Sequence, residues 1–188
     1  GGYCLQDILL ILYISLCIML RLRYDSATGV LRYIFYWLVD VVIPYYVVSR
    51  GVKNIKDLKE VVNGIVVAVL VVSVIGVFEY LKHWLLYSAI GAHYGSRDVT
   101  GGYLLRGDLL RAVATSGQPI ILGYVVAIGI GFYFFIQDGI KDWKLRSIGF
   151  LILIAGIIAP VSRGPWVGLM VIMLVLFALS KQKSRIAV

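Results

Sequence analysis

The sequence alternates long apolar runs with short gaps that carry basic residues, and this alternation restricts the folds open to the chain. An α-helix needs about 20 apolar residues to cross the ~30 Å hydrocarbon core of a bilayer, and several of the runs approach that length. Of the 188 residues, 61% are hydrophobic and 15% are charged, compared with about 45–50% and about 25% in soluble domains. This composition excludes a soluble enzyme, a disordered tail and a disulfide-rich secreted module. It predicts an all-α, polytopic transmembrane helical bundle.

About six of these runs are predicted to span the membrane, within a single transmembrane domain that covers residues 1–188. The last two would be only ~21–24 Å long, so the turn between them is expected at membrane depth. The chain begins with Gly1 and no basic leader precedes the first run, so we expect no signal peptide and expect a fragment of a longer protein. The predicted spans are 3–20, 30–48, 61–81, 118–136, 147–160 and 165–180, and a long outer loop covers 83–117.

The basic residues predict which side of the membrane each gap faces. Three gaps on one side hold ten basic residues, and the positive-inside rule makes that side cytoplasmic. These are Arg50, Lys53, Lys56 and Lys59, then Lys141, Lys144 and Arg146, then Lys181, Lys183 and Arg185. The opposite side carries Arg21, Arg23, Arg97, Arg106, Arg111 and Arg163, of which the first two run against the rule. We attribute the net charge of +8 to the orientation of the chain in the membrane and to contact with anionic lipid head groups. We exclude a nucleic-acid-binding surface because no polar platform accompanies the charge.

Two predicted helices begin on the outer side with the same arrangement of residues. In the stretches 111–119 and 162–166 an Arg precedes a Gly, and a Pro follows in the first helical turn, where its missing N–H has no helical partner. A helix N-terminus exposes free N–H groups and the positive end of the helix dipole, so it suits an anion. The guanidinium fork of Arg matches the geometry of a phosphate. Arg111 and Arg163 are therefore candidate anion ligands.

Each candidate arginine also has a structural interpretation. A functional role is favoured for Arg163, because charge at membrane depth is costly, but this side chain could instead reach the interface or pair with Asp98 or Asp108. For Arg111 the two interpretations are balanced. For Arg106 a solvated surface position is favoured.

No metal site and no cofactor site is predicted. His83 and His93 are the only histidines, and no second ligand lies at zinc-binding spacing. Asp40 and Glu79 fall inside predicted spans, where an ionisable group can mark an ion path; a polar contact between helices is the favoured alternative. The paired leucines of 104–111 predict a short amphipathic segment on the outer membrane surface.

Three stretches carry a family resemblance. Residues 72–80 end a span before the outer loop, Arg111 precedes the Gly-Gln-Pro run of 117–124, and residues 162–168 open with Ser-Arg-Gly. Together they resemble the O-antigen ligase and O-antigen polymerase superfamily of bacterial inner-membrane glycosyltransferases. The resemblance covers about residues 65–179.

The resemblance implies a GT-C-like membrane bundle that acts at the periplasmic face of the inner membrane. The donor would be a glycan on undecaprenyl pyrophosphate, and the acceptor would be lipid A-core for a ligase or another lipid-linked glycan for a polymerase. The resemblance implies no nucleotide sugar. Arg111 and Arg163 match the arginines that hold the donor's pyrophosphate in that family, and Arg106 is a third candidate ligand.

The chain departs from this family in its number of spans, since members have considerably more. Their large periplasmic loop, with a histidine proposed as the base, follows the point where this sequence ends, so we expect the catalytic base beyond residue 188 and assign none here. The alternative from another class is a non-enzymatic membrane subunit or transporter that uses Asp40 and Glu79 within the membrane.

Overall fold

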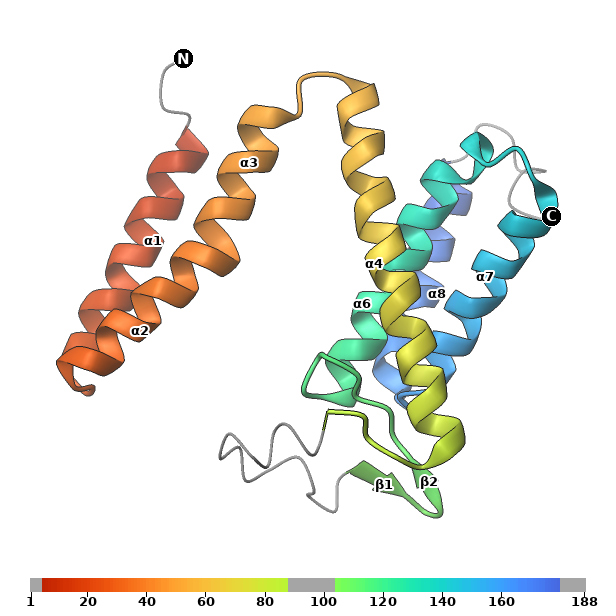
Figure 1. Ribbon diagram of the computed structural model, residues 1–188. Helices are drawn as coiled ribbons and strands as arrows, with labels where there is room; N and C mark the ends of the chain where they lie inside the picture. The colour runs from red at the N-terminus through yellow and green to blue at the C-terminus, as the bar shows by residue number, and fades with distance from the viewer. Residues whose placement is uncertain (1–4, 88–103, 180–188) are drawn as a thin grey trace. The chain divides into compact units, whose positions relative to one another are not determined.

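The computed structural model describes residues 5–87 and 104–179, and this part of the chain is mainly helical, as predicted (Figure 1). The chain divides into two compact units, Gly1–Leu58 and Lys59–Val188, here called unit 1 and unit 2. The helices are α1 (Leu5–Leu22), α2 (Ala27–Trp37), η1 (Leu38–Val42), α3 (Ile43–Gly51), α4 (Ile55–Lys82), α6 (Pro119–Ile136), η3 (Gln137–Gly139), α7 (Trp143–Ile158) and α8 (Arg163–Leu179), and the strands are β1 (Leu105–Arg106) and β2 (Leu109–Leu110).

Within the described residues, four helical segments are long and apolar enough to cross a membrane. They overlap four of the six predicted spans. The other two predicted spans overlap α7 and α8, whose 16 and 17 residues give only about 24–26 Å of helix. Several membrane helices are thus supported, whereas six full-length spans are not. The four segments are Leu5–Leu22, Ala27–Gly51, Ile55–Lys82 and Pro119–Gly139.

In unit 1 a buried carboxylate joins α1 to α3. Asp7 in α1 is 9% exposed. Its Oδ1 accepts a hydrogen bond from the hydroxyl of Tyr45 at 2.7 Å, and its Oδ2 accepts one from Nη2 of Arg50 at 2.8 Å. Elsewhere in the unit, the rings of Tyr13 and Trp37 meet edge to face with their centroids 5.6 Å apart. Ion pairing and aromatic packing therefore hold α1 against the long segment formed by α2, η1 and α3.

A proline explains why the middle of that long segment is π-helical. Pro44 has no N–H to donate to the carbonyl of Asp40, four residues earlier, and its ring crowds that carbonyl. The N–H of Ile43 bonds instead to the carbonyl of Leu38, five residues back, so the turn widens by one residue. The predicted span 30–48 is consequently one continuous helical segment with a π-helical turn at its centre.

Helix α6 forms the core of unit 2, and Pro119–Gly139 is the most buried of the four candidate spans. Its glycines let neighbouring helices approach closely. A Cβ on Gly129 would lie 2.5 Å from Cγ1 of Val69 in α4, and a Cβ on Gly123 would lie 2.4 Å from Cγ of Pro165 in α8. Small residues at such contacts are the usual means of packing helices that cannot rely on water exclusion within a bilayer.

Helix α7 is fixed by a close approach to α4 and by polar contacts at its start. A Cβ on Gly156 would lie 2.5 Å from Cβ of Ser73 in α4. The hydroxyl of Tyr133 in α6 donates to the carbonyl of Arg146 at 2.6 Å, and the carboxylate of Asp142 caps the N-terminus of α7 by accepting a backbone N–H at 2.9 Å. The C-terminal end of α7 contacts the loop that precedes α6, because the N–H of Ala112 donates to the carbonyl of Ala159.

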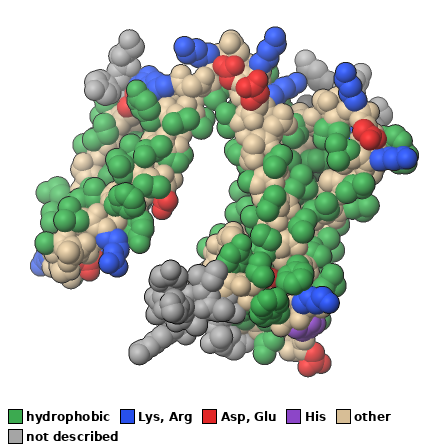
Figure 2. Space-filling view, in the orientation of Figure 1, with side chains coloured by type: hydrophobic (Ala, Val, Ile, Leu, Met, Phe, Trp, Pro, Cys, Tyr) green, Lys and Arg blue, Asp and Glu red, His purple; other side chains and the backbone are tan. Residues whose placement is uncertain are grey.

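Charged side chains gather at the helix ends. On the face shown in Figure 2, hydrophobic side chains cover the sides of the helices, and Lys and Arg lie at their ends. Within unit 2, Lys141 lies in the connection between α6 and α7 and Lys144 in the first turn of α7, whereas Arg106, Arg111 and Arg163 belong to the opposite end of these helices. The lysines and these arginines therefore lie at opposite ends of the helices.

We expect Gly129→Ala to destabilise unit 2. The new methyl group would overlap Val69, whose β-branched side chain has little freedom to move, and overpacking of this kind costs about 1–3 kcal/mol. Thermal unfolding of the full chain in detergent measures the loss as a lower midpoint.

The matched control is Gly64→Ala in α4, because a Cβ there has no atom within 4 Å. Alanine also has the higher helix propensity, so this variant should be at least as stable as the natural chain. Equal midpoints for the two variants would contradict the close approach at Gly129.

Candidate functional site

The segment before α6 begins with a β-hairpin, which corrects the expectation of an amphipathic membrane-surface segment at 104–111. Leu105 pairs with Leu110 and Arg106 with Leu109. Gly107 occupies the first turn position with a φ of +63°, a conformation that glycine adopts readily in two-residue hairpins. The two leucine pairs therefore belong to the two antiparallel strands and not to one helix face. Leu104 and Leu110 are buried beside Val113 and Leu85.

A fully buried carboxylate holds the residues that follow the hairpin. Glu79 lies near the C-terminal end of α4 and is 1% exposed. Its Oε2 accepts the backbone N–H groups of Val113 at 2.9 Å and Ala114 at 2.8 Å, and its Oε1 accepts that of Leu86 at 3.0 Å. The carboxylate thus satisfies three backbone donors, and the two buried ones, from Val113 and Ala114, would be costly to leave unpaired. It joins the end of α4 to the segment that carries Arg111.

Two arginines bind the turn between α7 and α8. Arg111 donates from Nε to the carbonyl of Pro160 at 3.2 Å and from Nη2 to Oγ of Ser162 at 3.1 Å. Arg106 donates from Nη1 to the carbonyl of Val161 at 2.9 Å. The two guanidinium groups therefore contact three consecutive residues of one turn.

This turn is strained at its centre. Val161 has a φ of +47°, and a β-branched residue rarely adopts the left-handed region. Such a conformation persists only where surrounding contacts impose it. Here the contacts are the bond from Arg106 to the Val161 carbonyl and the bond from the Val161 N–H to the carbonyl of Ile158 at 2.9 Å.

Arg163 follows directly and is the first residue of α8. Its side chain is exposed, and it makes no hydrogen bond or ion pair with any part of the chain that the structure describes. Trp166, one turn later, donates from Nε1 to the carbonyl of Ile157 at 2.9 Å, so the start of α8 is fixed to the end of α7. The free guanidinium of Arg163 therefore stands on a rigid helix terminus.

The predicted ligands Arg106, Arg111 and Arg163 are thus brought to one turn, but in different roles. Arg106 and Arg111 donate hydrogen bonds to the turn, whereas the N–H groups of the Arg163 side chain are exposed and have no acceptor among the described residues. Asp108, an alternative partner for Arg163, forms no ion pair with it among the described residues. The other alternative partner, Asp98, lies outside these residues.

The remaining candidates are placed elsewhere or are not described. Asp40 lies in η1 of unit 1 with an exposed side chain. His83 follows α4 at the surface, and His93 lies outside the described residues. Within residues 5–87 and 104–179, no group of three His, Cys, Asp or Glu side chains could hold a metal ion.

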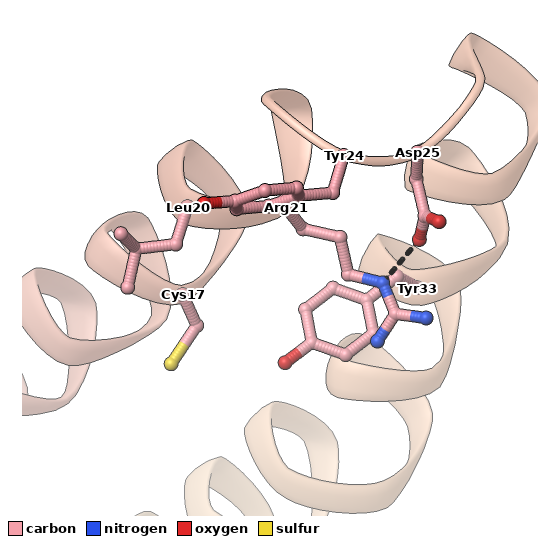
Figure 3. Close-up of a pocket in the computed structure, with 6 residues that line it drawn as sticks. All are labelled: Cys17, Leu20, Arg21, Tyr24, Asp25 and Tyr33. Atoms are coloured by element: carbon pink, nitrogen blue, oxygen red, sulfur yellow. Dashed lines mark hydrogen bonds and ion pairs between the residues drawn. The ribbon is translucent and has the colours of Figure 1, made fainter.

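Unit 1 has a separate open hollow of about 500 Å³ beside the α1–α2 turn (Figure 3). Arg21 is the cationic residue that lines it, and this side chain already has partners within unit 1. Its Nε pairs with the carboxylate of Asp25, and its guanidinium carbon lies 4.4 Å from the ring centroid of Tyr33. A guanidinium already neutralised by a carboxylate suits an anionic ligand less well than the exposed Arg163.

Sequence reasoning noted Glu79 only as an ionisable group in a span and missed its contacts with the 113–114 backbone. A polar residue close to the end of an apolar helix, followed by a loop that must satisfy its own N–H groups, was the available signal. Asp7 was missed altogether, although it too is a carboxylate within an apolar run.

No known family model matches this chain, and no curated protein or solved structure matches it.

We expect Arg111→Lys to loosen the α7–α8 turn. Lysine carries one ammonium group and cannot reproduce the bonds that Nε and Nη2 of Arg111 make in two directions, and a lost hydrogen bond to a charged group costs about 1.5–3 kcal/mol. Hydrogen exchange measured over residues 159–163 should become faster. Arg23→Lys is the control, since Arg23 is exposed and has no partner among the described residues; unchanged exchange in Arg111→Lys would argue against the contacts of Arg111.

Proposed function

We propose that this chain is part of a membrane glycosyltransferase of the O-antigen ligase or polymerase type. It would transfer or polymerise a glycan from undecaprenyl pyrophosphate at the periplasmic face of a bacterial inner membrane. The observation that carries the proposal is the gathering of Arg106, Arg111 and Arg163 at the α7–α8 turn. The resemblance of 72–80, 111–124 and 162–168 to that superfamily supports the same activity.

The proposed chemistry asks this site to stabilise a leaving group. Transfer of the glycan breaks its bond to the pyrophosphate, so negative charge builds on the phosphate oxygens as the bond lengthens. Preorganised donors that face this charge lower the barrier because they need no rearrangement during the reaction. Arg163 and the free N–H groups at the start of α8 supply such donors together.

The three arginines would divide the work. Arg106 and Arg111 fix the turn through Pro160, Val161 and Ser162 and add positive potential, while Arg163 contacts the pyrophosphate. A transporter that uses Asp40 and Glu79 has less support, because Glu79 is engaged by three backbone N–H groups. The partners of the proposed enzyme are the lipid-linked glycan donor and a glycan or lipid A-core acceptor.

The test is binding of an isoprenoid pyrophosphate by the full chain in lipid nanodiscs. Farnesyl pyrophosphate is a short probe that can be titrated, and farnesyl monophosphate and farnesol separate recognition of the pyrophosphate from recognition of the lipid tail. We expect the pyrophosphate to bind most tightly, and we expect Arg163→Ala to weaken its binding about 10–100-fold, as the loss of a charge-assisted contact implies. Arg163→Lys should restore little of it.

Arg163→Ala should leave the thermal midpoint unchanged, because this side chain has no partner in the described part of the chain. Arg23→Ala, an exposed arginine in unit 1, is the control for charge alone and should bind the probe normally. Equal affinity for the pyrophosphate, the monophosphate and farnesol would overturn the proposed function.

A further inference from the structure

Glu79 stands apart from the arginines, yet two of the three N–H groups that its carboxylate accepts belong to the segment that carries Arg111. We infer that Glu79 is a positioning residue of the pyrophosphate site and acts through Arg111; this inference rests on the proposed function. Glu79 does not touch the proposed ligand position. It fixes the backbone from which the side chain of Arg111 reaches the α7–α8 turn.

The first step is the bond from the carboxylate to the loop. Oε2 of Glu79 accepts both the Val113 and the Ala114 N–H groups. Ala114 has a φ of +47°, a conformation that a non-glycine residue adopts at a cost. Since the carboxylate binds the amide of Ala114 directly, it helps to hold this strained residue in place.

The second step runs from the loop to the turn. Ala112, adjacent to Val113, donates its N–H to the carbonyl of Ala159 at 3.1 Å. Arg111 donates its own N–H to the carbonyl of Leu104 at 2.8 Å. Its side chain donates to Pro160 and Ser162, the two neighbours of Val161 in the turn. In the segment 111–114, residues 113 and 114 are therefore bound by Glu79, while Arg111 binds the α7–α8 turn.

Position 79 requires a carboxylate because its three N–H donors need two oxygen acceptors. Three N–H groups converge on two oxygens, and both oxygens of an ionised carboxylate accept. An amide has one oxygen, and its NH₂ group would face at least one of these donors. Glu79 forms no ion pair with a cation among the described residues. A buried charge of this kind is costly unless its hydrogen bonds compensate, so packing alone does not account for this residue.

The experiment compares Glu79→Gln with Glu60→Gln, the same chemical change at an exposed position of the same helix. Two quantities are measured on the full chain in nanodiscs: hydrogen exchange over 111–116 and 159–163, and the dissociation constant of farnesyl pyrophosphate. Each change is also made together with Arg111→Ala, which gives a double-mutant cycle. Circular dichroism and the thermal midpoint report whether the variants stay folded.

We expect Glu79→Gln to speed exchange in both segments and to weaken probe binding about 5–20-fold, within the range measured for coupled residues, and we expect Glu60→Gln to change neither. In the Arg111→Ala background, Glu79→Gln should weaken binding no further. Additive effects on binding, or unchanged exchange at 159–163 in Glu79→Gln, would overturn the inference.

The two proposals can fail separately. If the natural chain shows no preference for the pyrophosphate probe, the proposed function is wrong, and the link from Glu79 to the turn is judged on exchange alone. If the chain binds the probe but Glu79→Gln binds it normally, the function stands and the positioning role is wrong. If Glu79→Gln loses its helical signal, Glu79→Asp takes its place in the cycle, since it keeps the charge and shortens the reach.

Discussion

The structure at the end of unit 2 that holds the α7–α8 turn depends on how the polar groups of its backbone find hydrogen-bond partners. A helix bundle can satisfy its own N–H and C=O groups within each helix, but the loop between α4 and α6 and the turn between α7 and α8 cannot. Here side chains of α4 and of the loop satisfy them. The carboxylate of Glu79 accepts N–H groups of 113–114, and the guanidinium groups of Arg106 and Arg111 donate to the turn. Ala114 and Val161, two of the three non-glycine residues with a positive φ among residues 5–87 and 104–179, belong to this network.

The helices were largely predictable because their signal is local. Hydropathy placed the predicted span 118–136 almost where α6 lies, and the Pro of each outer helix start stands at the first turn of α6 and α8. Hydropathy also gave α7 and α8 as short helices, although it did not show where they begin, and their 16 and 17 residues are too few for full spans. It also could not reveal η1, where one proline changes the hydrogen-bond pattern without interrupting the apolar run.

The site was predictable in its members and not in their roles. Arg106, Arg111 and Arg163 were chosen for their chemistry, and the fold brings all three to one turn. Which of them donates to the protein depends on acceptors supplied by the 160–162 turn, far away in the sequence. The hairpin of 104–110 was missed for a related reason, because leucines in pairs fit an amphipathic helix face as well as two short strands, and the pairing of Leu105 with Leu110 decided it.

The π-helical turn of unit 1 has a consequence for the geometry of the whole segment 27–51. One additional residue in a turn rotates everything beyond it by about 100° relative to a regular α-helix. A helical wheel drawn through the entire segment would therefore assign the wrong azimuth to one of its halves. Tyr45 and Arg50 reach Asp7 from the rephased half, so the angular offset introduced ahead of Pro44 is what turns these two side chains toward α1.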